Sequence, residues 1–184
     1  MAFTGVRRAL VSDVDEIGRI NALAWRARLP GILPAEVLDG LRPEEFAAEW
    51  ARSLIHPPSS RHQVLVAVDG DDVVGYAAVA PSADPDADDV TGEVIALEVD
   101  PGQWRRGHGS RLVAAVVDTA RTSGMTRLST WCPLDDQVRR AFLVSAGWGP
   151  DTALRDLEVP AVTPDSDGLL REARLITAIA DADD

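Results

Sequence analysis

Residues 92–124 read GEVIALEVDPGQWRRGHGSRLVAAVVDTARTSG, and this stretch decides the fold. The near-continuous apolar run from Val94 to Val99 predicts a strand. Asp100-Pro101-Gly102 ends that strand, because proline cannot donate to a sheet ladder and glycine favours a turn. After Gly107-x-Gly109, apolar residues recur at helical spacing and predict a helix that ends near Gly124.

A strand that passes through a glycine turn into a helix is suited to binding phosphate. The first N–H groups of a helix lack partners, and the helix dipole places partial positive charge there. Glycines let the backbone approach a pyrophosphate closely, and Arg105 and Arg106 can neutralise it. The stretch has no Gly-Lys-Ser/Thr, so it is not a Walker A loop. Leu112 stands where a GxGxxG fingerprint needs glycine or alanine, which excludes that motif as well.

Val99, Pro101, Arg106, Gly107 and Gly109 are spaced as in a known motif. The pattern resembles the acetyl-CoA-binding motif of the GNAT superfamily of N-acetyltransferases. Trp104 departs from the Gln or Arg that this family often has there, but backbone amides do not depend on that side chain. The resemblance spans roughly residues 6–178, and it implies an α/β fold with a mixed sheet and one N-acetyltransferase domain over residues 1–184.

The rest of the chain predicts the order β-α-α-α-β-β-β-α-β-α-β-β. Ser12 and Asp15 predict a capping box for the first helix, and Asp135 or Asp136 predicts the cap of the last. The acidic, proline-broken segment from Ser82 to Asp89 is expected to be a solvated loop. The remaining strands are expected at Val6–Leu10, Gln63–Val68, Val73–Ala80, Arg127–Cys132, Arg155–Val159 and Arg171–Ala178, and the remaining helices at residues 12–29, 35–41, 43–54 and 135–146.

The resemblance implies that acetyl-CoA lies where the fourth and fifth strands splay apart. The backbone of Leu97 to Val99 would pair with the pantetheine arm, and the amides of Arg105 to Ser110 would hold the pyrophosphate. The alternative for these glycines is an ordinary strand-to-helix turn. The candidate cofactor-binding residues are Leu97, Glu98, Val99, Arg105, Arg106, Gly107, His108, Gly109, Ser110, Asp136 and Phe142.

Glu93 is the candidate general base. It lies eleven residues before Trp104, the offset at which the histone-acetylating branch of the family carries its catalytic glutamate. A carboxylate partly desolvated in the cleft would have a raised pKa suited to this role. The alternative is a structural glutamate at a strand start. Strict alternation would place Glu93 and Glu98 on opposite faces, so the two are not expected to serve one site.

A general acid is harder to identify. Many family members have a tyrosine in the helix after the fifth strand, but Leu143 stands at that position here. The only tyrosine, Tyr76, is expected to pack within the third strand. Ser145 is expected to point elsewhere on the helix, so either a water assists the leaving thiolate or the thiolate leaves unaided. Leu143 therefore leaves open the alternative that the chain is a non-catalytic acyl-CoA-binding domain. A third alternative is an unrelated α/β phosphate-binding protein, for which the match to the motif would be a coincidence.

Composition restricts the partners. With 30 acidic and 18 basic residues the net charge is −12, which disfavours nucleic acid and mildly favours a cationic small-molecule or peptide amine as acceptor. One cysteine, Cys132, excludes an internal disulfide, and three scattered histidines predict no metal site. The sequence shows no apolar run long enough for a membrane span, so a cytoplasmic protein is expected. Whether it forms a homodimer is left open.

Two further sequence features bear on the acceptor. The segment from Trp25 to Pro34 resembles a subgroup signature, W-x-x-x-(Y/L)-x-G-(I/L)-L-P, which in that subgroup borders the acceptor pocket. Trp25, Trp50 and Trp131 are candidates for lining that pocket, although aromatic residues at such spacings usually belong to the core.

Overall fold

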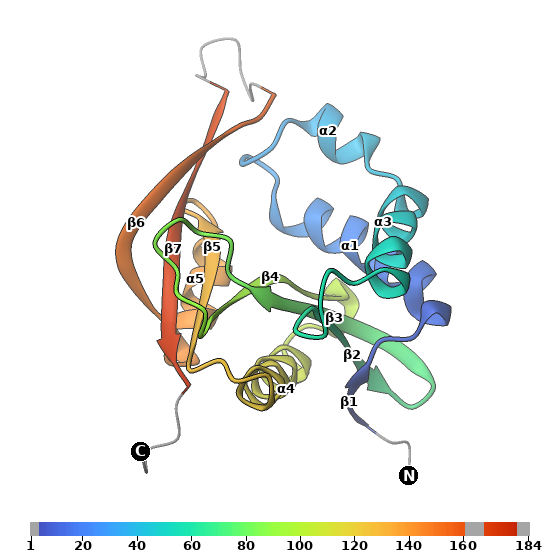
Figure 1. Cartoon of the computed structure of the whole chain (residues 1–184). Coiled ribbons are helices and arrows are strands. Elements are labelled where there is room, and N and C mark those ends of the chain that lie inside the picture. Colours follow the sequence, from blue (N-terminus) through green and yellow to red (C-terminus); the bar gives the residue numbers. More distant parts are fainter. Residues whose placement is uncertain (1–3, 161–167, 180–184) are drawn as a thin grey trace.

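The computed structural model describes residues 4–160 and 168–179, which form one seven-stranded mixed sheet with helices on both faces (Figure 1). The strand order is β1-β2-β3-β4-β5-β7-β6, and only β4 and β5 run parallel. The strands are β1 (Thr4–Arg8), β2 (Gln63–Asp69), β3 (Asp72–Pro81), β4 (Thr91–Val99), β5 (Arg127–Pro133), β6 (Gly149–Glu158) and β7 (Leu169–Ala178). The helices are α1 (Val14–Arg28), α2 (Ala35–Gly40), α3 (Pro43–Ile55), α4 (His108–Thr122) and α5 (Gln137–Ser145), with 3-10 turns η1 (Val11–Asp13) and η2 (Pro101–Gln103).

The predicted fold class and element order are confirmed, with local differences. β6 begins at Gly149, earlier than the predicted strand at Arg155. The predicted Ser12–Asp15 capping box is wrong, because α1 begins at Val14 after Asp13. The Asp13 carboxylate accepts instead from the Leu10 amide at 2.7 Å.

Two apolar layers hold the helices against the sheet. On one face α4 and α5 bury the larger core, which includes Leu112, Val116 and Leu143 together with Leu128 of β5. On the other face α1 packs on β3 and β4, and its Ile17 and Ile20 lie in a second buried cluster with Tyr76. Burial of these side chains contributes roughly 1.5–3 kcal/mol for each large aliphatic residue. The sheet therefore separates an α4 face from an α1 face.

A β-bulge interrupts β4 at Ile95. Ala78 of β3 pairs with Ala96 and Val79 pairs with Val94, so Ile95 has no partner across the ladder. A bulge shifts the alternation of side chains by one residue. As a result Glu93 and Glu98 both lie opposite residues of a single face of β3, Ala80 and Tyr76 respectively. The predicted placement of the two carboxylates on opposite faces is wrong, because it assumed an unbroken strand.

The parallel strands β4 and β5 separate after a short paired stretch. Their ladder covers only Thr91 to Glu93 against Arg127 to Ser129. One more contact follows, in which the Thr130 hydroxyl donates to the Val94 carbonyl at 2.8 Å. Beyond it, within the described residues, the edge of β4 facing β5 is unpaired by backbone. The predicted splay between the fourth and fifth strands is confirmed.

Gly18 allows α1 and α3 to approach each other closely. A Cβ atom at this position would lie 2.3 Å from the Pro43 carbonyl oxygen and 2.8 Å from the Ala47 nitrogen, both of them backbone atoms. Gly18→Ala is therefore expected to lower the free energy of unfolding by about 1–3 kcal/mol, the usual cost of overpacking. An unhindered Gly→Ala change inside a helix would instead stabilise by about 1 kcal/mol.

Urea denaturation measures this difference, and Gly40→Ala is the matched control. Gly40 lies in α2, and a Cβ atom added there would have no neighbour within 4 Å, so its replacement is expected to leave stability unchanged or slightly raised. Equal stabilities for Gly18→Ala and Gly40→Ala would show that the two helices can move apart without cost.

Candidate active site

A groove of about 860 Å³ opens where β4 and β5 separate. The end of β4, the loop after it, the first turn of α4 and one side of α5 form its walls. Most of the candidate cofactor-binding residues are brought together here. Those that line the groove are Leu97, Glu98, Val99, Arg105, Gly107, His108, Gly109, Ser110 and Phe142.

The loop before α4 has the geometry of an anion-binding site. Gly107 is the N-cap of α4 with a φ of 83°, and Arg105 also adopts a positive φ of 64°. Left-handed residues next to a helix start can turn successive amides into a concave, anion-binding arrangement. Within the described residues, the N–H groups from Arg105 to Ser110 donate to no backbone carbonyl outside their own helix. The loop thus presents unused donors at the positive end of the α4 dipole.

Arg106 lies outside the residues that line the groove. Its Nη1 donates to Oε1 of Gln103 at 2.7 Å, and Gln103 itself lines the groove. The side chain of Arg106 is exposed, so it stands at the rim rather than in the wall. Its predicted role in neutralising a pyrophosphate stays a prediction.

The edge of β4 that faces the groove carries two engaged carbonyls. Arg139 Nη1 donates to the Leu97 carbonyl at 3.3 Å, and Trp104 Nε1 donates to the Val99 carbonyl at 2.8 Å. A carbonyl oxygen has two lone pairs, so each can accept a second hydrogen bond. An extended ligand arm laid along this edge would share these carbonyls with the two side chains or displace them.

Two buried carboxylates and two mostly buried arginines form a cluster at the inner end of the groove. Oε1 of Glu98 accepts from Arg28 Nη2 at 2.7 Å and from Arg139 Nη1 at 3.2 Å. Arg28 also pairs with Asp136. The cluster joins the last residue of α1 to β4 and α5, and its four formal charges cancel. Sequence reasoning missed both arginines, because residues so far apart in the chain meet only in the fold.

Asp136 does not line the groove, contrary to its prediction as a cofactor contact. Its carboxylate is buried, accepts from the Arg139 amide at 3.0 Å as the N-cap of α5, and pairs with Arg28. The prediction that Asp136 caps this helix is confirmed. Both carboxylate oxygens already accept hydrogen bonds from protein partners, which hold the side chain against α5 and Arg28.

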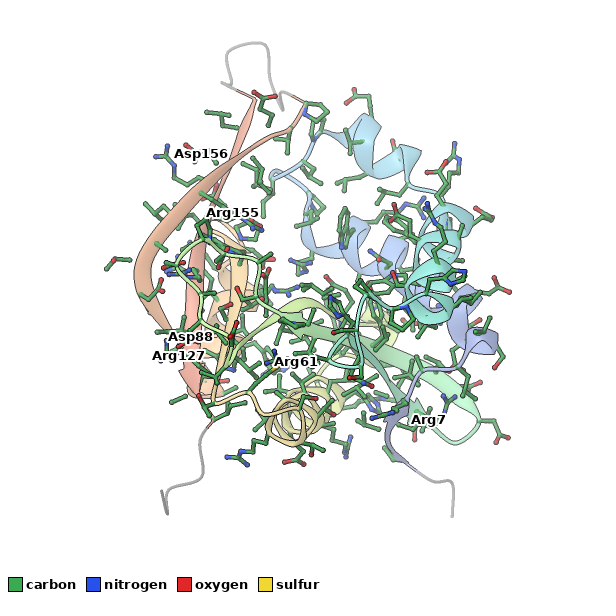
Figure 2. All side chains as sticks on the ribbon, in the orientation of Figure 1. Arg7, Arg61, Asp88, Arg127, Arg155 and Asp156 are labelled. Carbon is green, nitrogen blue, oxygen red and sulfur yellow. The ribbon has the colours of Figure 1, made fainter. Side chains whose placement is uncertain are left out.

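Glu93 lies half-buried on β4, on the α1 face of the sheet. Burial raises the pKa of its carboxyl, and the nearby carboxylates of Asp84 and Glu172 raise it further. Arg155 and Arg174 act in the opposite direction. Arg155 projects from β6 (Figure 2) with its guanidinium carbon 4.4 Å from the centroid of the Trp131 ring. A carboxyl with a raised pKa is suited to accept a proton near neutral pH.

The acidic loop between β3 and β4 is tied to the sheet. It lies across β5 and β7, drawn in green in Figure 1. Arg174 of β7 pairs with Asp84 at 3.0 Å and with Asp86 at 2.6 Å, and it also pairs with Asp151. Trp131 Nε1 donates to Asp84 as well. The prediction of a solvated loop is wrong for Asp84, which is mostly buried because Arg174 and Trp131 hold it beside Glu93.

The candidates for a general acid remain few. Leu143 is buried in the core, and Tyr76 packs as predicted, with its hydroxyl donating to Asn21 at 2.6 Å. Burial raises the pKa of Tyr76 well above its usual value. Ser145 points to a different side of α5 from Leu143, as predicted, and it lines the groove. Its hydroxyl nevertheless donates to the Phe142 carbonyl at 2.6 Å, within the helix.

His108 and the tryptophans occupy packed positions. His108 is 3% exposed, and burial lowers its pKa. Trp25 packs edge-on against Phe46, and Trp50 packs edge-on against Tyr76. Trp50 also lines a second cavity of about 360 Å³ on the α1 face, together with the exposed bulge residue Ile95.

Comparison with known proteins points to one family. The family model described as the acetyltransferase (GNAT) family matches residues 24–148. A mycothiol acetyltransferase of Kineococcus radiotolerans is 34% identical over 137 residues, which are 69% of this chain and 43% of that protein. The uncharacterized N-acetyltransferase YuaI of Bacillus subtilis is 27% identical over 128 residues, 68% of this chain and 69% of that protein. The chain thus spans less than half the length of the first of these relatives.

Solved structures share the whole fold. The PaiA N-acetyltransferase of Thermoplasma acidophilum, solved with coenzyme A, superimposes with a TM-score of 0.75 at 13% identity, covering 96% of this chain and 99% of that one. YncA of Salmonella typhimurium, solved with acetyl-CoA, gives a TM-score of 0.68 at 19% identity, covering 98% and 96%. Among the described residues, no helix has the length and apolar character needed to cross a membrane.

Proposed function

Because this chain belongs to the acetyltransferase (GNAT) family, we propose that it moves the acetyl group of acetyl-CoA to a primary amine by direct attack within a ternary complex. The observation that carries this proposal is the groove between the unpaired edge of β4 and α5, which leads to unused amides at the start of α4. The donors of that loop suit a pyrophosphate, and the free edge of β4 suits an extended amide-bearing arm.

Glu93 is proposed as the general base. Attack on a thioester requires a neutral amine, so a proton must leave the ammonium form of the acceptor. Glu93 is half-buried with a raised pKa, and the bulge at Ile95 places it on the same face as Glu98. The acceptor would therefore approach from the α1 face, while acetyl-CoA lies in the groove and extends its thioester toward that face.

A cationic amine is the acceptor class that the charges favour. The carboxylates of Asp84 and Glu172 beside Glu93 are each paired with an arginine, so this preference rests on Glu93 itself and on the net charge of −12. The match covers only 43% of the mycothiol acetyltransferase of Kineococcus radiotolerans, so we do not infer the acceptor of this chain from that relative. A panel of small amines and amino-terminal peptides, scored by thiol release from acetyl-CoA, tests this acceptor class.

Thermal unfolding with acetyl-CoA tests the groove. At a hundredfold excess over its dissociation constant, a ligand that binds only the folded protein stabilises it by about 2.7 kcal/mol, which raises the melting temperature by roughly 5–11 °C for a domain of this size. ADP is the comparison ligand, because it carries the pyrophosphate without the pantetheine arm. A melting temperature that acetyl-CoA leaves unchanged would remove the proposed function.

A non-catalytic acyl-CoA-binding domain is the second candidate, and Leu143 is the observation that favours it. The side chain that replaces the family's tyrosine is buried in the core and cannot act as an acid. This candidate predicts stabilisation by acetyl-CoA with no thiol released in the presence of any amine of the panel. The rate of thiol release therefore distinguishes an enzyme from a non-catalytic binder, whereas the affinity for acetyl-CoA does not.

A further inference from the structure

Arg139 lies at the inner end of the groove, where β4 parts from β5. The hydroxyl of Thr130 donates a hydrogen bond to the Val94 carbonyl, so the unpaired edge of β4 begins after Val94. The Leu97 carbonyl on that edge accepts from Arg139 Nη1. An arm that starts at the α4 loop and runs along β4 from Val99 toward Leu97 reaches Arg139 at its far end. The far end of the arm of coenzyme A is its sulfur.

One edge of the Arg139 guanidinium has no partner among the described residues. Nη1 makes both contacts, to the Leu97 carbonyl at 3.3 Å and to Glu98 Oε1 at 3.2 Å. In the part of the chain that the structure describes, neither Nε nor Nη2 has an acceptor, and Nε is fully buried. These two nitrogens form the fork with which arginine binds anions. A buried donor without a partner costs about 1–3 kcal/mol. Of the two nitrogens, Nη2 is the one with exposed surface, so a ligand in the groove would contact Arg139 through Nη2.

We propose that Arg139 stabilises the thiolate of coenzyme A as it leaves, in the place where other chains of this fold would use a tyrosine. This rests on the proposed function. Glu93 takes the ammonium proton of the acceptor and releases it to solvent before attack. As the nitrogen–carbon bond forms, the carbon–sulfur bond breaks and its electron pair goes to sulfur, while the second proton lost by the nitrogen passes to Glu93. Arginine stays protonated at working pH, so it acts by charge and hydrogen bonding and transfers no proton.

The charged groups around Arg139 are few and fixed. Glu98 of β4, Arg28 of α1 and Asp136 at the start of α5 complete the cluster. Glu98 stays paired with Arg28 when Arg139 is removed, so the variant need not lose the cluster. Arg139 already acts on one sulfur in the protein: its charge lowers the pKa of Cys132, although burial dominates and raises that pKa to about 11.

The pKa of the thiol of bound coenzyme A tests this directly and needs no acceptor. The protein is saturated with coenzyme A, and the ultraviolet absorbance of the thiolate is titrated against protein alone and against free coenzyme A. A cation within about 4–6 Å of a thiol lowers the pKa of that thiol by about one unit or more. We expect the pKa of the bound thiol to lie at least about one unit below that of free coenzyme A measured in the same experiment.

The variants are chosen from one helix. Arg139→Gln removes the charge and is expected to return the thiol pKa to that of free coenzyme A, while Arg139→Lys is expected to retain part of the shift. Arg140→Gln is the matched control, because the Arg140 side chain donates to the Leu134 carbonyl at 3.3 Å and does not line the groove. It is expected to behave as the wild type.

The outcomes separate this inference from the proposed function. A wild-type thiol pKa equal to that of free coenzyme A overturns the role of Arg139, as does an unchanged shift in Arg139→Gln. In both cases coenzyme A still binds, and the proposed function stands. Failure of the wild type to bind coenzyme A at all would instead remove the proposed function. If Arg139→Gln binds too weakly to be saturated, the comparison of wild type with Arg139→Lys decides.

Discussion

Replacing Glu93 by glutamine is expected to lower the rate of thiol release about 10²- to 10⁴-fold, the usual contribution of a general base. Glutamine keeps the size and the hydrogen bonding of the side chain but cannot take the amine proton. The affinity for acetyl-CoA is expected to change little, because Glu93 does not line the groove. Steady-state rates with the best amine of the panel, together with thermal shifts by acetyl-CoA, measure both quantities.

The pH dependence gives a second measure of the same residue. A general base works in its deprotonated form, so the rate falls as pH falls through its pKa. Because the pKa of Glu93 is raised above the ordinary 4.5, mainly by burial, this fall is expected at higher pH than for an exposed glutamate. Glu158→Gln, at the exposed end of β6, is the control and should keep the wild-type profile. A wild-type rate and profile in Glu93→Gln would remove Glu93 from the mechanism.

Gly107→Val is expected to weaken coenzyme A binding at least about tenfold while the protein still folds. A β-branched residue avoids the left-handed conformation that Gly107 adopts, with a φ of 83°. The loop must then turn, and the amides before α4 no longer converge on one point. Each hydrogen bond lost to a charged group costs about 1.5–3 kcal/mol, which corresponds to about a ten- to hundredfold change in affinity. Calorimetric titration with coenzyme A measures it.

Gly124→Val is the matched control for this variant. Gly124 lies just past the other end of α4 with a φ of 76°, and no atom lies within 4 Å of the added Cβ position. Both variants are expected to lose roughly 1–2 kcal/mol of stability from backbone strain. Only Gly107→Val is expected to lose affinity. If both bind coenzyme A like the wild type, the loop before α4 is only a turn.

Local signals in the sequence were enough for the element order and for the loop before α4. Proline, glycine and a helical apolar pattern act over a few residues, so the strand, the turn and the helix of residues 92–124 could be predicted. The same local signals marked Gly107 and Gly109 as a phosphate-binding turn, and the family resemblance assigned them to the cofactor groove. The absence of the usual tyrosine could also be read from the sequence, because leucine stands at that position, 143, in the helix after the fifth strand.

Two features could not be read from the sequence. The bulge at Ile95 depends on how β4 aligns with β3, and alternation alone placed Glu93 and Glu98 on the wrong relative faces. Arg139 meets Glu98 only because α5 packs beside the open edge of β4, 41 positions away in the chain. The same holds for Arg174 and Asp84, which are 90 positions apart. Propensities carry no information on such distant pairs.

The bulge in β4 also determines how this strand can be compared with others. A single-residue deletion at Ile95 would restore regular pairing with β3 and keep Glu98 opposite Tyr76, on the same face of the sheet as Arg28. Substitutions in β4 alter one contact each, whereas a deletion elsewhere in the strand would turn every later side chain to the opposite face. A homologue with a straight strand must therefore be aligned with a gap at Ile95, or its glutamates will be matched to the wrong side of the sheet.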